Sequence, residues 1–468
     1  MVLLTVLLLA TFVAASPTDS ELVRASSPSA SLDSIIPPAS KLLPLVSQPR
    51  SMYKKQLVEG ICRNLPDHFW TTSLAGSSLD QEYLANVTIG GQNFSLIVDT
   101  GSSDTWVAMK GFKCFNMTSG GESQSPSECG FGSEGFDPSK SSTFEPYADV
   151  DFNISYSDGG FMVGNVGYDT VSVGGMTVTH QEIGLVTHAS WHGDEINTGL
   201  LGLAYPGLTS VHDRKTGDQV IYDPLFFSAV KQSAVPHPCK YRLSGLRRSN
   251  DVAIVHVLRV LMGNRRFLDF SIALNRGTFS ARSSPTYDPK LGYLGFGGYV
   301  PVPTTYPTVT VPVLVDTQGT PKYFFWTVEI DSYIFPGSSA LKTSSNATIL
   351  DTGTTLNFLP THIARAYNSK FSPPATYVAS DGVYYVHCNA KVPEFSVKIG
   401  SKAFSIDARD QVVPTGSKDG NGEDICISGT QDGGPGNTFV LGDVFLHNVV
   451  STYNIHSNQI TLSQRAPY

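Results

Sequence analysis

The sequence predicts an all-β protein made of two related lobes. Short β-branched and aliphatic runs alternate with turns rich in Gly and Pro, which is typical of β-sheets. Two segments share one design: Ile97–Ser103 (IVDTGSS) and Ile349–Thr355 (ILDTGTT). Each is followed, at a similar distance, by two apolar residues and a Gly, within Leu200–Leu203 and Val440–Asp443. This self-similarity indicates that a whole lobe is repeated.

Length and composition support this division and exclude several classes of protein. The 468 residues suffice for two domains, and a hydrophobic content of 41% allows large cores. The net charge of −8 argues against nucleic acid as a partner, and the six cysteines suit a few disulfides in a secreted chain. The sequence has no metal-ligand spacing, phosphate loop or nicotinamide fingerprint, so we expect no metal and no cofactor.

The N-terminal part differs in composition from the rest. The apolar run Val2–Ala15 ends in small residues and is too short to span a membrane, so residues 1–15 are predicted to be a signal peptide of a secreted, extracellular protein. No later stretch is apolar enough to cross a membrane, and we expect no membrane partner. Residues 16–77 are rich in Ser, Pro and Ala and then turn basic, which suits a flexible leader or a propeptide. The first lobe is expected over 78–300 and the second over 301–468.

The repeated segments carry the chemistry. Asp99 and Asp351 each follow an apolar pair that predicts the end of a buried strand. Burying a lone carboxylate at such a position is energetically unfavourable. Gly101 and Gly353 permit a sharp turn and a close approach of another backbone. One Asp-Thr-Gly segment is also typical of an ordinary strand-ending loop. Two matching copies favour a pair of facing carboxylates.

These segments resemble those of the pepsin-like aspartic endopeptidases, most closely the enzymes that fungi secrete. The resemblance extends from about Leu79 to the C-terminus, except near Cys239. It implies a bilobal fold with the active site in the cleft between the lobes. It also implies that Asp99 and Asp351 activate a water that hydrolyses peptide bonds of protein and peptide substrates at acidic pH. We expect a monomer, and residues 16–77 correspond to a propeptide.

The neighbours of the two aspartates have roles that the resemblance implies. Thr100 and Thr352 would link the two loops through hydrogen bonds from their hydroxyls to backbone groups. Ser102 and Thr354 would hydrogen-bond the outer carboxylate oxygens, which favours the ionised form.

A hairpin over Tyr83–Val98 is predicted to lead into Asp99. A second hairpin, around Asp158-Gly159-Gly160, resembles the flap that covers the substrate. Tyr156 stands in the place of the flap tyrosine, with Ser157 where the family often has Gly, and Trp106 would hold Tyr156 through its indole N–H. The alternative for Tyr156 is an exposed strand aromatic. Asp158 would either pair with a Lys before the scissile bond or serve only as a turn residue.

The resemblance also suggests covalent features. It implies the disulfides Cys114–Cys129 and Cys388–Cys426, with Cys62 leaving in the propeptide. Five sequons mark candidate glycosylation sites on a secretory route: Asn86, Asn93, Asn116, Asn153 and Asn346.

Residues 239–269 do not fit the pattern of the first lobe. Before them, Tyr222–Val230 predicts a helix, and after them Phe270–Leu274 predicts a strand that should follow almost at once. The segment between is rich in Arg and contains Cys239, which has no evident partner.

The codons that begin and end this segment can contain an intron donor and an acceptor, and splicing between them keeps the reading frame. We therefore expect a retained intron. The alternative is a surface insertion with an amphipathic helix near Val252–Met262, since long loops cost little stability.

In the second lobe, Tyr323–Ile330 predicts a strand that leads towards Asp351. Two rival functions remain. One is a catalytically inactive pepsin-fold binder or inhibitor, but such relatives usually lose an aspartate or its Gly, and this chain keeps both. The other is a lectin-like β module, which leaves the paired Asp-Thr-Gly segments unexplained.

Overall fold

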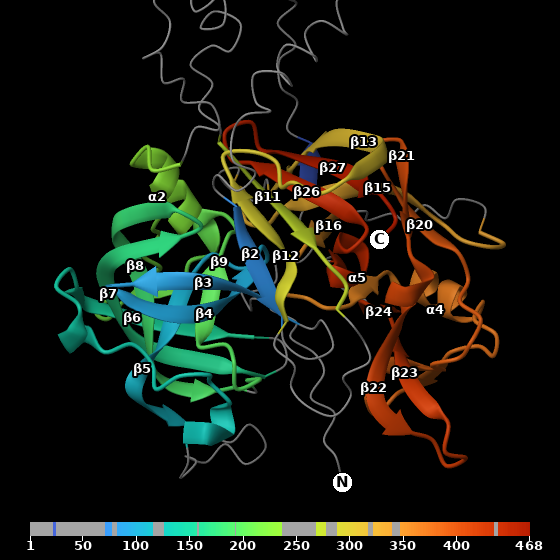
Figure 1. Ribbon diagram of the computed structural model, residues 1–468, viewed down its shortest axis with the longest axis horizontal. Helices are drawn as coiled ribbons and strands as arrows, with labels where there is room; N and C mark the ends of the chain where they lie inside the picture. The colour runs from blue at the N-terminus through green and yellow to red at the C-terminus, as the bar shows by residue number, and fades with distance from the viewer. Residues whose placement is uncertain are drawn as a thin grey trace, which may run out of the picture.

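Strands dominate the computed structural model, as the sequence predicts, and they form two lobes joined by a shared sheet (Figure 1). The structure describes residues 22–24, 71–76, 82–115, 126–156, 159–191, 193–235, 268–277, 288–316, 322–338, 347–434 and 439–468. Within these ranges no helix is long and apolar enough to cross a membrane.

The largest sheet has 14 strands and extends from the first lobe into the junction between the lobes. Its first-lobe strands are, in spatial order, β10 (Val211–Asp213), β6 (Glu145–Ser155), β7 (Phe161–Val173), β8 (Met176–Ser190), β5 (Thr105–Cys114), β9 (Gly199–Gly202), β4 (Gln92–Asp99) and β3 (Tyr83–Ile89). It continues through β2 (Thr71–Gly76), β12 (Asp288–Phe296), β11 (Asp269–Leu274), β26 (Val449–Asn454), β27 (Gln459–Arg465) and β13 (Thr304–Pro312).

The second lobe contains two further sheets. One consists of β21 (Lys402–Ile406), β20 (Phe395–Ile399), β15 (Thr327–Ile334), β16 (Ala347–Leu350), β25 (Phe439–Leu441), β17 (Asn357–Leu359) and β24 (Thr430–Asp432). The other consists of β18 (Thr376–Val378), β19 (Val383–His387), β23 (Asp424–Ser428) and β22 (Val412–Lys418). A separate pair joins β1 (Leu22–Arg24) to β14 (Leu314–Asp316).

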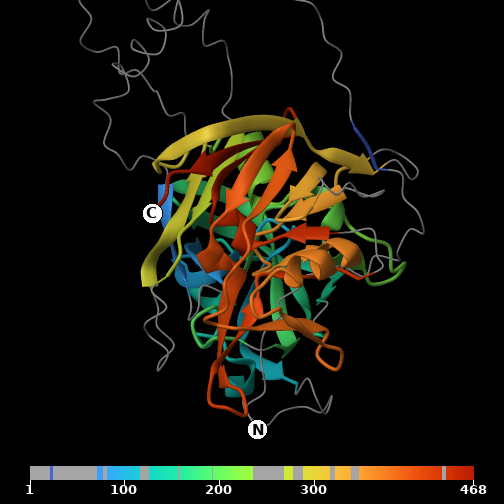
Figure 2. The ribbon, with the colours of Figure 1, turned by 90° about the vertical axis from the view of Figure 1, so that its right-hand side faces the viewer.

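Helices are short in the described part of the chain. The α-helices are α2 (Leu225–Lys231), α4 (Thr361–Asn368) and α5 (Asp443–Leu446). The 3-10 helices are η3 (Pro126–Cys129), η4 (Pro138–Lys140), η5 (Pro206–Leu208) and η7 (Ala408–Gln411). In the side view of Figure 2, α4 lies on the outer face of the second lobe.

The predicted repeat is present in three dimensions. In the first lobe β4 pairs in parallel with β9, and β9 pairs antiparallel with β5. In the second lobe β16 pairs in parallel with β25, and β25 pairs antiparallel with β17. The strand beside each Asp-Thr-Gly loop, β9 in the first lobe and β25 in the second, therefore contains the apolar pair of the repeated motif.

Strands from both sides of the expected lobe boundary at residue 300 pair with one another in the 14-stranded sheet. β11 pairs with β12 on one side and with β26, near the C-terminus, on the other. β2 lies between β12 and β3, although its residues belong to the range expected for the propeptide. In Figure 1 this shared sheet lies between the lobes.

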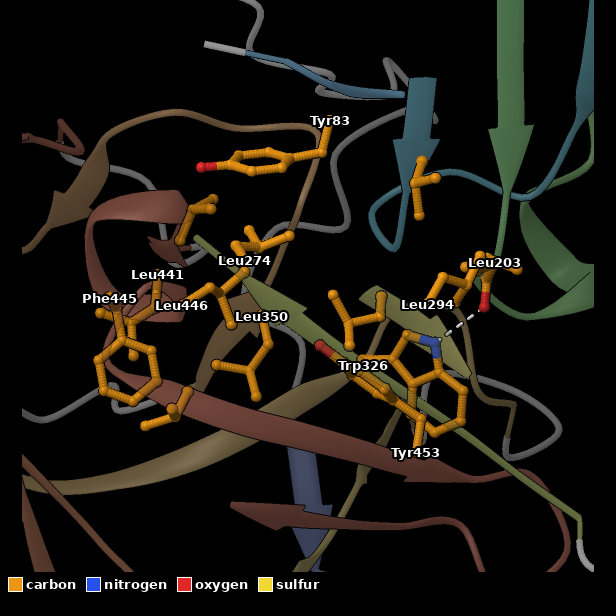
Figure 3. Packing of buried hydrophobic residues seen from close by; sticks show 14 of the residues in the cluster. Tyr83, Leu203, Leu274, Leu294, Trp326, Leu350, Leu441, Phe445, Leu446 and Tyr453 are labelled. Carbon is orange, nitrogen blue, oxygen red and sulfur yellow. Dashed lines mark hydrogen bonds between the residues drawn. The ribbon is translucent and has the colours of Figure 1, made fainter. Parts of the chain in front are cut away.

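The core is continuous across the junction. Figure 3 shows Trp326 and Tyr453 of the second lobe close to Leu203 and Leu294, and the indole of Trp326 donates a 2.9 Å hydrogen bond to the Leu203 carbonyl. Trp326 and Tyr453 have no exposed surface. Burying aromatic rings of this size contributes strongly to stability, so this contact helps to hold the two aspartate loops together.

Three sequence predictions can be compared with these elements. The hairpin over Tyr83–Val98 forms as β3 and β4, and α2 and β11 lie where the helix and strand flanking residues 239–269 were expected. The strand expected from Tyr323 begins only at Thr327. The segment before it contacts the first lobe instead, because the Phe324 carbonyl accepts a hydrogen bond from the Tyr205 amide at 3.2 Å. Residues 239–267 lie outside the described part.

Candidate active site

Two parallel strand pairs bring the aspartates to the junction of the lobes. Asp99 ends β4, beside Gly202 of β9, and its carbonyl accepts a hydrogen bond from Leu203 N at 2.8 Å. Asp351 follows β16, and its amide donates to the Leu441 carbonyl of β25 at 3.1 Å. Backbone hydrogen bonds to neighbouring strands therefore hold both loops in place independently of their side chains.

The two loops are cross-linked almost symmetrically through their threonines. The Thr100 hydroxyl donates to the Leu350 carbonyl at 2.8 Å, and the Thr352 hydroxyl donates to the Val98 carbonyl at 2.7 Å. Each hydroxyl also accepts the backbone N–H of the other threonine, at 3.1 Å in both directions. Both side chains are buried. Each hydroxyl thus uses its donor and an acceptor site, as the resemblance implied.

Each carboxylate is hydrogen-bonded within its own loop. Asp99 accepts from Gly101 N at 2.6 Å and from the Ser102 hydroxyl. Asp351 accepts from Gly353 N at 2.9 Å and from the Thr354 hydroxyl at 2.6 Å. These donors orient the carboxyl groups and stabilise negative charge on the pair.

The carboxyl groups face each other across the two glycines. A Cβ added to Gly101 would lie 2.5 Å from Oδ1 of Asp351, and one added to Gly353 would lie 2.6 Å from Oδ1 of Asp99. Both distances are below van der Waals contact, so each carboxylate fits only because the opposing residue is Gly. The sequence alone had suggested this close approach.

This environment disfavours two negative charges. Asp99 and Asp351 are only 1% and 2% exposed. Burial, and then the charge of Asp351, raise the pKa of Asp99 well above its ordinary value. The pair therefore retains a proton over a pH range in which isolated carboxyls would lose theirs. One ionised and one protonated carboxyl together provide a base and an acid at one place.

The expected flap is a hairpin between β6 and β7. Tyr156 is buried, and its hydroxyl accepts a 2.9 Å hydrogen bond from the indole N–H of Trp106, as the resemblance implied. The alternative of an exposed strand aromatic is therefore wrong for Tyr156. Ser157 and Asp158 lie outside the described residues.

Sequence reasoning missed a second tryptophan beside the flap. Trp191 is buried, and its ring lies 5.4 Å from the Tyr156 ring and 5.9 Å from the Trp106 ring, measured between centroids. The three aromatics form one cluster that fixes the base of the hairpin. The available signal was an isolated Trp between the flap residues and the Leu-Leu-Gly segment.

Both expected disulfides are confirmed. Cys114 and Cys129 are joined with a Cα–Cα distance of 5.7 Å, and Cys388 and Cys426 with one of 5.0 Å. Cys62 and Cys239 lie outside the described part of the chain.

The described sequon residues are accessible. Asn86, Asn93 and Asn153 are exposed on β3, β4 and β6. Asn116 and Asn346 lie outside the described residues.

Comparison with known proteins identifies the family. The model of the eukaryotic aspartyl protease family matches residues 82–237 and 270–465, so the chain belongs to this family of pepsin-like, aspartic-type endopeptidases. Both aspartate loops lie inside the matched ranges. The match is interrupted at residues 238–269, which nearly coincides with the segment that the sequence marked as foreign.

Individual relatives agree with this assignment. The chain is 33% identical over 389 residues to a probable aspartic-type endopeptidase of Aspergillus fumigatus, covering 82% of this chain and 79% of the relative. It is 29% identical to mucorpepsin of Rhizomucor pusillus, covering 81% of this chain and 78% of that one. The crystal structure of an aspartic proteinase from Irpex lacteus superposes with a TM-score of 0.59 at 20% identity, covering 85% and 98% of the two chains, which shows the shared fold.

Proposed function

We propose that this protein is a secreted, catalytically active aspartic endopeptidase that cleaves proteins and peptides at acidic pH. The observation that carries the proposal is the pair of buried carboxyl groups, each seated against the glycine of the other loop. An inactive binding protein would not need this arrangement, because two facing carboxyls in a buried site cost stability. The chain retains both aspartates and both glycines.

The chemistry follows from one proton shared by Asp99 and Asp351. The ionised carboxylate takes a proton from a water that attacks the peptide carbonyl, while the protonated partner donates to the developing oxyanion. A proton then passes to the leaving nitrogen as the C–N bond breaks. The hydroxyls of Ser102 and Thr354 keep the outer oxygens in place. The flap hairpin with Tyr156 is proposed to cover the substrate and exclude water.

The proposal is tested by incubating the secreted protein with a denatured globular protein at about pH 3 to 5, where one carboxyl of the pair stays protonated. Fragments should appear, and pepstatin, an inhibitor of aspartic endopeptidases, should prevent their formation. Intact substrate, or cleavage that continues under saturating pepstatin, would contradict the proposal and favour an inactive binder or a contaminating protease.

Asp158 is proposed to set specificity for Lys on the residue before the scissile bond. It follows Tyr156 by two positions in the sequence, where the resemblance implies the tip of the flap. A carboxylate there can pair with the ammonium group of Lys, and removing it should cost about 1.4 kcal/mol of transition-state binding, roughly a tenfold loss in kcat/KM for Lys substrates alone. The measurement compares Lys and Leu peptides in wild type and Asp158→Ser. Equal losses for both peptides would show that Asp158 is only a turn residue.

Residues 1–15 are proposed to be a signal peptide, followed by an acid-released propeptide whose basic residues pair with the aspartates near neutral pH. The propeptide is proposed to cover residues 16–77, which include β2, whose Leu74 and Ala75 are buried in the shared sheet of the full chain.

Residues 239–269 are proposed to be a retained intron, in line with the interrupted family match. Mass mapping and N-terminal sequencing of the secreted protein test both boundaries. A mature N-terminus well before residue 77 would contradict the proposed propeptide end, and tryptic peptides from 243–264 would show that the segment is real protein.

A further inference from the structure

A buried ion pair connects the shared sheet to the second lobe. Arg276, which follows β11, donates two hydrogen bonds to Asp410 of η7: Nε lies 2.6 Å from Oδ1 and Nη2 lies 2.7 Å from Oδ2. The two side chains are only 7% and 1% exposed. Two parallel hydrogen bonds between a guanidinium and a carboxylate fix both the distance and the orientation of the groups. The pair therefore ties η7 firmly to the end of β11.

The hydrogen bonds around Asp410 favour its ionised form. Besides the guanidinium, Nδ2 of Asn448 donates to Oδ2 of Asp410 at 2.7 Å. The neighbours of Asn448 determine how its amide is oriented, because its Oδ1 accepts from Nη2 of Arg276 and from the Asp407 amide, both at 2.9 Å. Neither a guanidinium nor an amide NH2 group can accept a proton from a protonated carboxyl. The geometry of these donors thus suits a carboxylate and not a carboxylic acid.

The charges around the pair act in the same direction. Burial opposes the ionisation of Asp410, but hydrogen bonds with His447 and Arg276 outweigh it and lower the pKa of Asp410 to about 2. Asp410 therefore keeps its charge at pH values near 4, where carboxyl groups with an ordinary pKa gain protons. The other titratable groups around the pair are Asp407 and Arg409 near η7, Arg465 of β27, Tyr468, whose ring lies over the guanidinium of Arg276, and Tyr83, which contacts the far side of the His447 ring.

A single helical turn, α5, separates the ion pair from the Asp351 loop. Nδ2 of Asn448, which bonds Asp410, also donates to the Val444 carbonyl of α5 at 3.0 Å. At the start of α5, two backbone amides donate to the carbonyls of Thr354 and Thr355, at 2.8 and 3.1 Å. Figure 1 shows α5 in the second lobe beside the shared sheet. A displacement of the ion pair would therefore reach the Asp351 loop through α5.

We propose that Arg276 and Asp410 are positioning residues: their ion pair holds α5, and through it the Asp351 loop, under the acidic conditions of the proposed function. The activity part of this inference rests on that function, whereas the stability part does not. Since the pKa of Asp410 is lower in the folded protein than in the unfolded chain, its stabilisation is complete above about pH 5. The stabilisation is lost as the pH falls through about 2.

The stability part is tested by the unfolding temperature of Asp410→Asn in the full chain at about pH 5, 3.5 and 2. At pH 5 the variant should unfold about 3–8 °C below wild type, because it leaves the charge of Arg276 buried without a partner. At least half of this difference should remain at pH 3.5. Less than half should remain at pH 2, where wild type itself loses the charge of Asp410.

Asp151→Asn is the matched control for the unfolding experiment. Asp151 pairs with Nε of Arg214 at 2.7 Å, but the two side chains are 49% and 45% exposed. Its replacement should shift the unfolding temperature by less than about 1–2 °C at each pH. An unchanged unfolding temperature of Asp410→Asn at pH 5, a difference that has vanished at pH 3.5, or one as large at pH 2 as at pH 5 would each overturn the proposal.

The positioning role is tested by kcat and KM at about pH 4 and 25 °C, with active sites counted by titration with pepstatin. In Asp410→Asn, kcat per titrated site should fall about fivefold while KM stays within about twofold, because the pair acts through α5. Arg276→Lys keeps the charge but not the forked pair of hydrogen bonds, so it should retain more of kcat than Arg276→Met. It also serves as the second variant if Asp410→Asn does not fold.

The two experiments separate the possible failures. An unchanged kcat per titrated site in a destabilised Asp410→Asn would mean that the ion pair only stabilises the fold, and the positioning role would be wrong. Wild type that neither cleaves substrate nor binds pepstatin would contradict the proposed function, and with it the activity part. The unfolding temperatures need no catalysis and would still decide whether the ion pair persists in acid.

Discussion

Replacing either aspartate of the pair by Asn should lower turnover by roughly 10³-fold or more while leaving the fold intact. Asp99→Asn and Asp351→Asn keep the shape of the side chain: the amide oxygen can accept from the N–H of Gly101 or Gly353, and the amide NH2 can donate to the hydroxyl of Ser102 or Thr354. Each leaves a single carboxyl, which cannot be the base towards water and the acid towards the oxyanion at the same time. The measurement is kcat/KM at about pH 4, with circular dichroism to verify folding.

Asp104→Asn is the matched control for these variants. Asp104 is also fully buried near the end of the first loop, but it accepts hydrogen bonds from Tyr222 at 2.6 Å and from Ser210 N at 3.0 Å and does not contact Asp351. Its replacement should affect stability and not the chemical step. Substantial activity in either dyad variant, or an equal loss in Asp104→Asn, would be incompatible with a two-aspartate mechanism.

The folded protein should lose stability as the pH rises from about 4 towards 7, and Glu82→Gln should reduce that loss. Burial, followed by the nearby charge of Asp194, raises the pKa of Glu82 well above its ordinary value. Burial also raises the pKa of Asp104, and that of Glu182 to about 7. These groups bind protons more tightly when folded than when unfolded. Their stabilisation is therefore complete below about pH 4.5 and is lost as the pH rises.

Gln at position 82 imitates the protonated acid without titrating. It can still accept the 3.0 Å hydrogen bond from Asn197 Nδ2. We expect Glu82→Gln to raise the free energy of unfolding by roughly 1–3 kcal/mol at pH 7 and to change it little at pH 4. Chemical denaturation at both pH values measures this. Glu394→Gln, at an exposed position, makes the same change in charge and should have no such effect. If Glu82→Gln destabilised the protein equally at both pH values, titration of Glu82 would not be the cause.

Sequence predicted the parts of the site that depend on local pattern. The two Asp-Thr-Gly loops were predicted from their repeated motif, whereas the family resemblance implied the Trp106–Tyr156 hydrogen bond and the threonine cross-links, which join residues 250 or more positions apart. The two disulfides were predicted through the resemblance, because cysteine spacing alone does not fix the pairing.

The features that the sequence did not predict depend on contacts between segments that are far apart in the chain. Nothing local in Thr71–Gly76 shows that it joins β12, more than 200 residues away, so its place in the shared sheet was missed. Tyr323 lies in an apolar run that predicts a strand, but the approach of the first lobe delays β15 to Thr327. The connection from Tyr83 to His447 likewise joins residues 364 positions apart. Such pairings are set by tertiary packing, which overrides local preference.

The most direct test of the shared-proton dyad is the pH dependence of kcat/KM on a pepstatin-sensitive peptide substrate, measured for wild type and Asp351→Asn between about pH 2 and 8. The account predicts a bell-shaped profile in the acidic range for wild type, with both limbs belonging to the pair, and no comparable activity at any pH for the variant. Activity in wild type that persists unchanged to pH 8, or a variant that keeps the bell-shaped profile at a similar height, would contradict it.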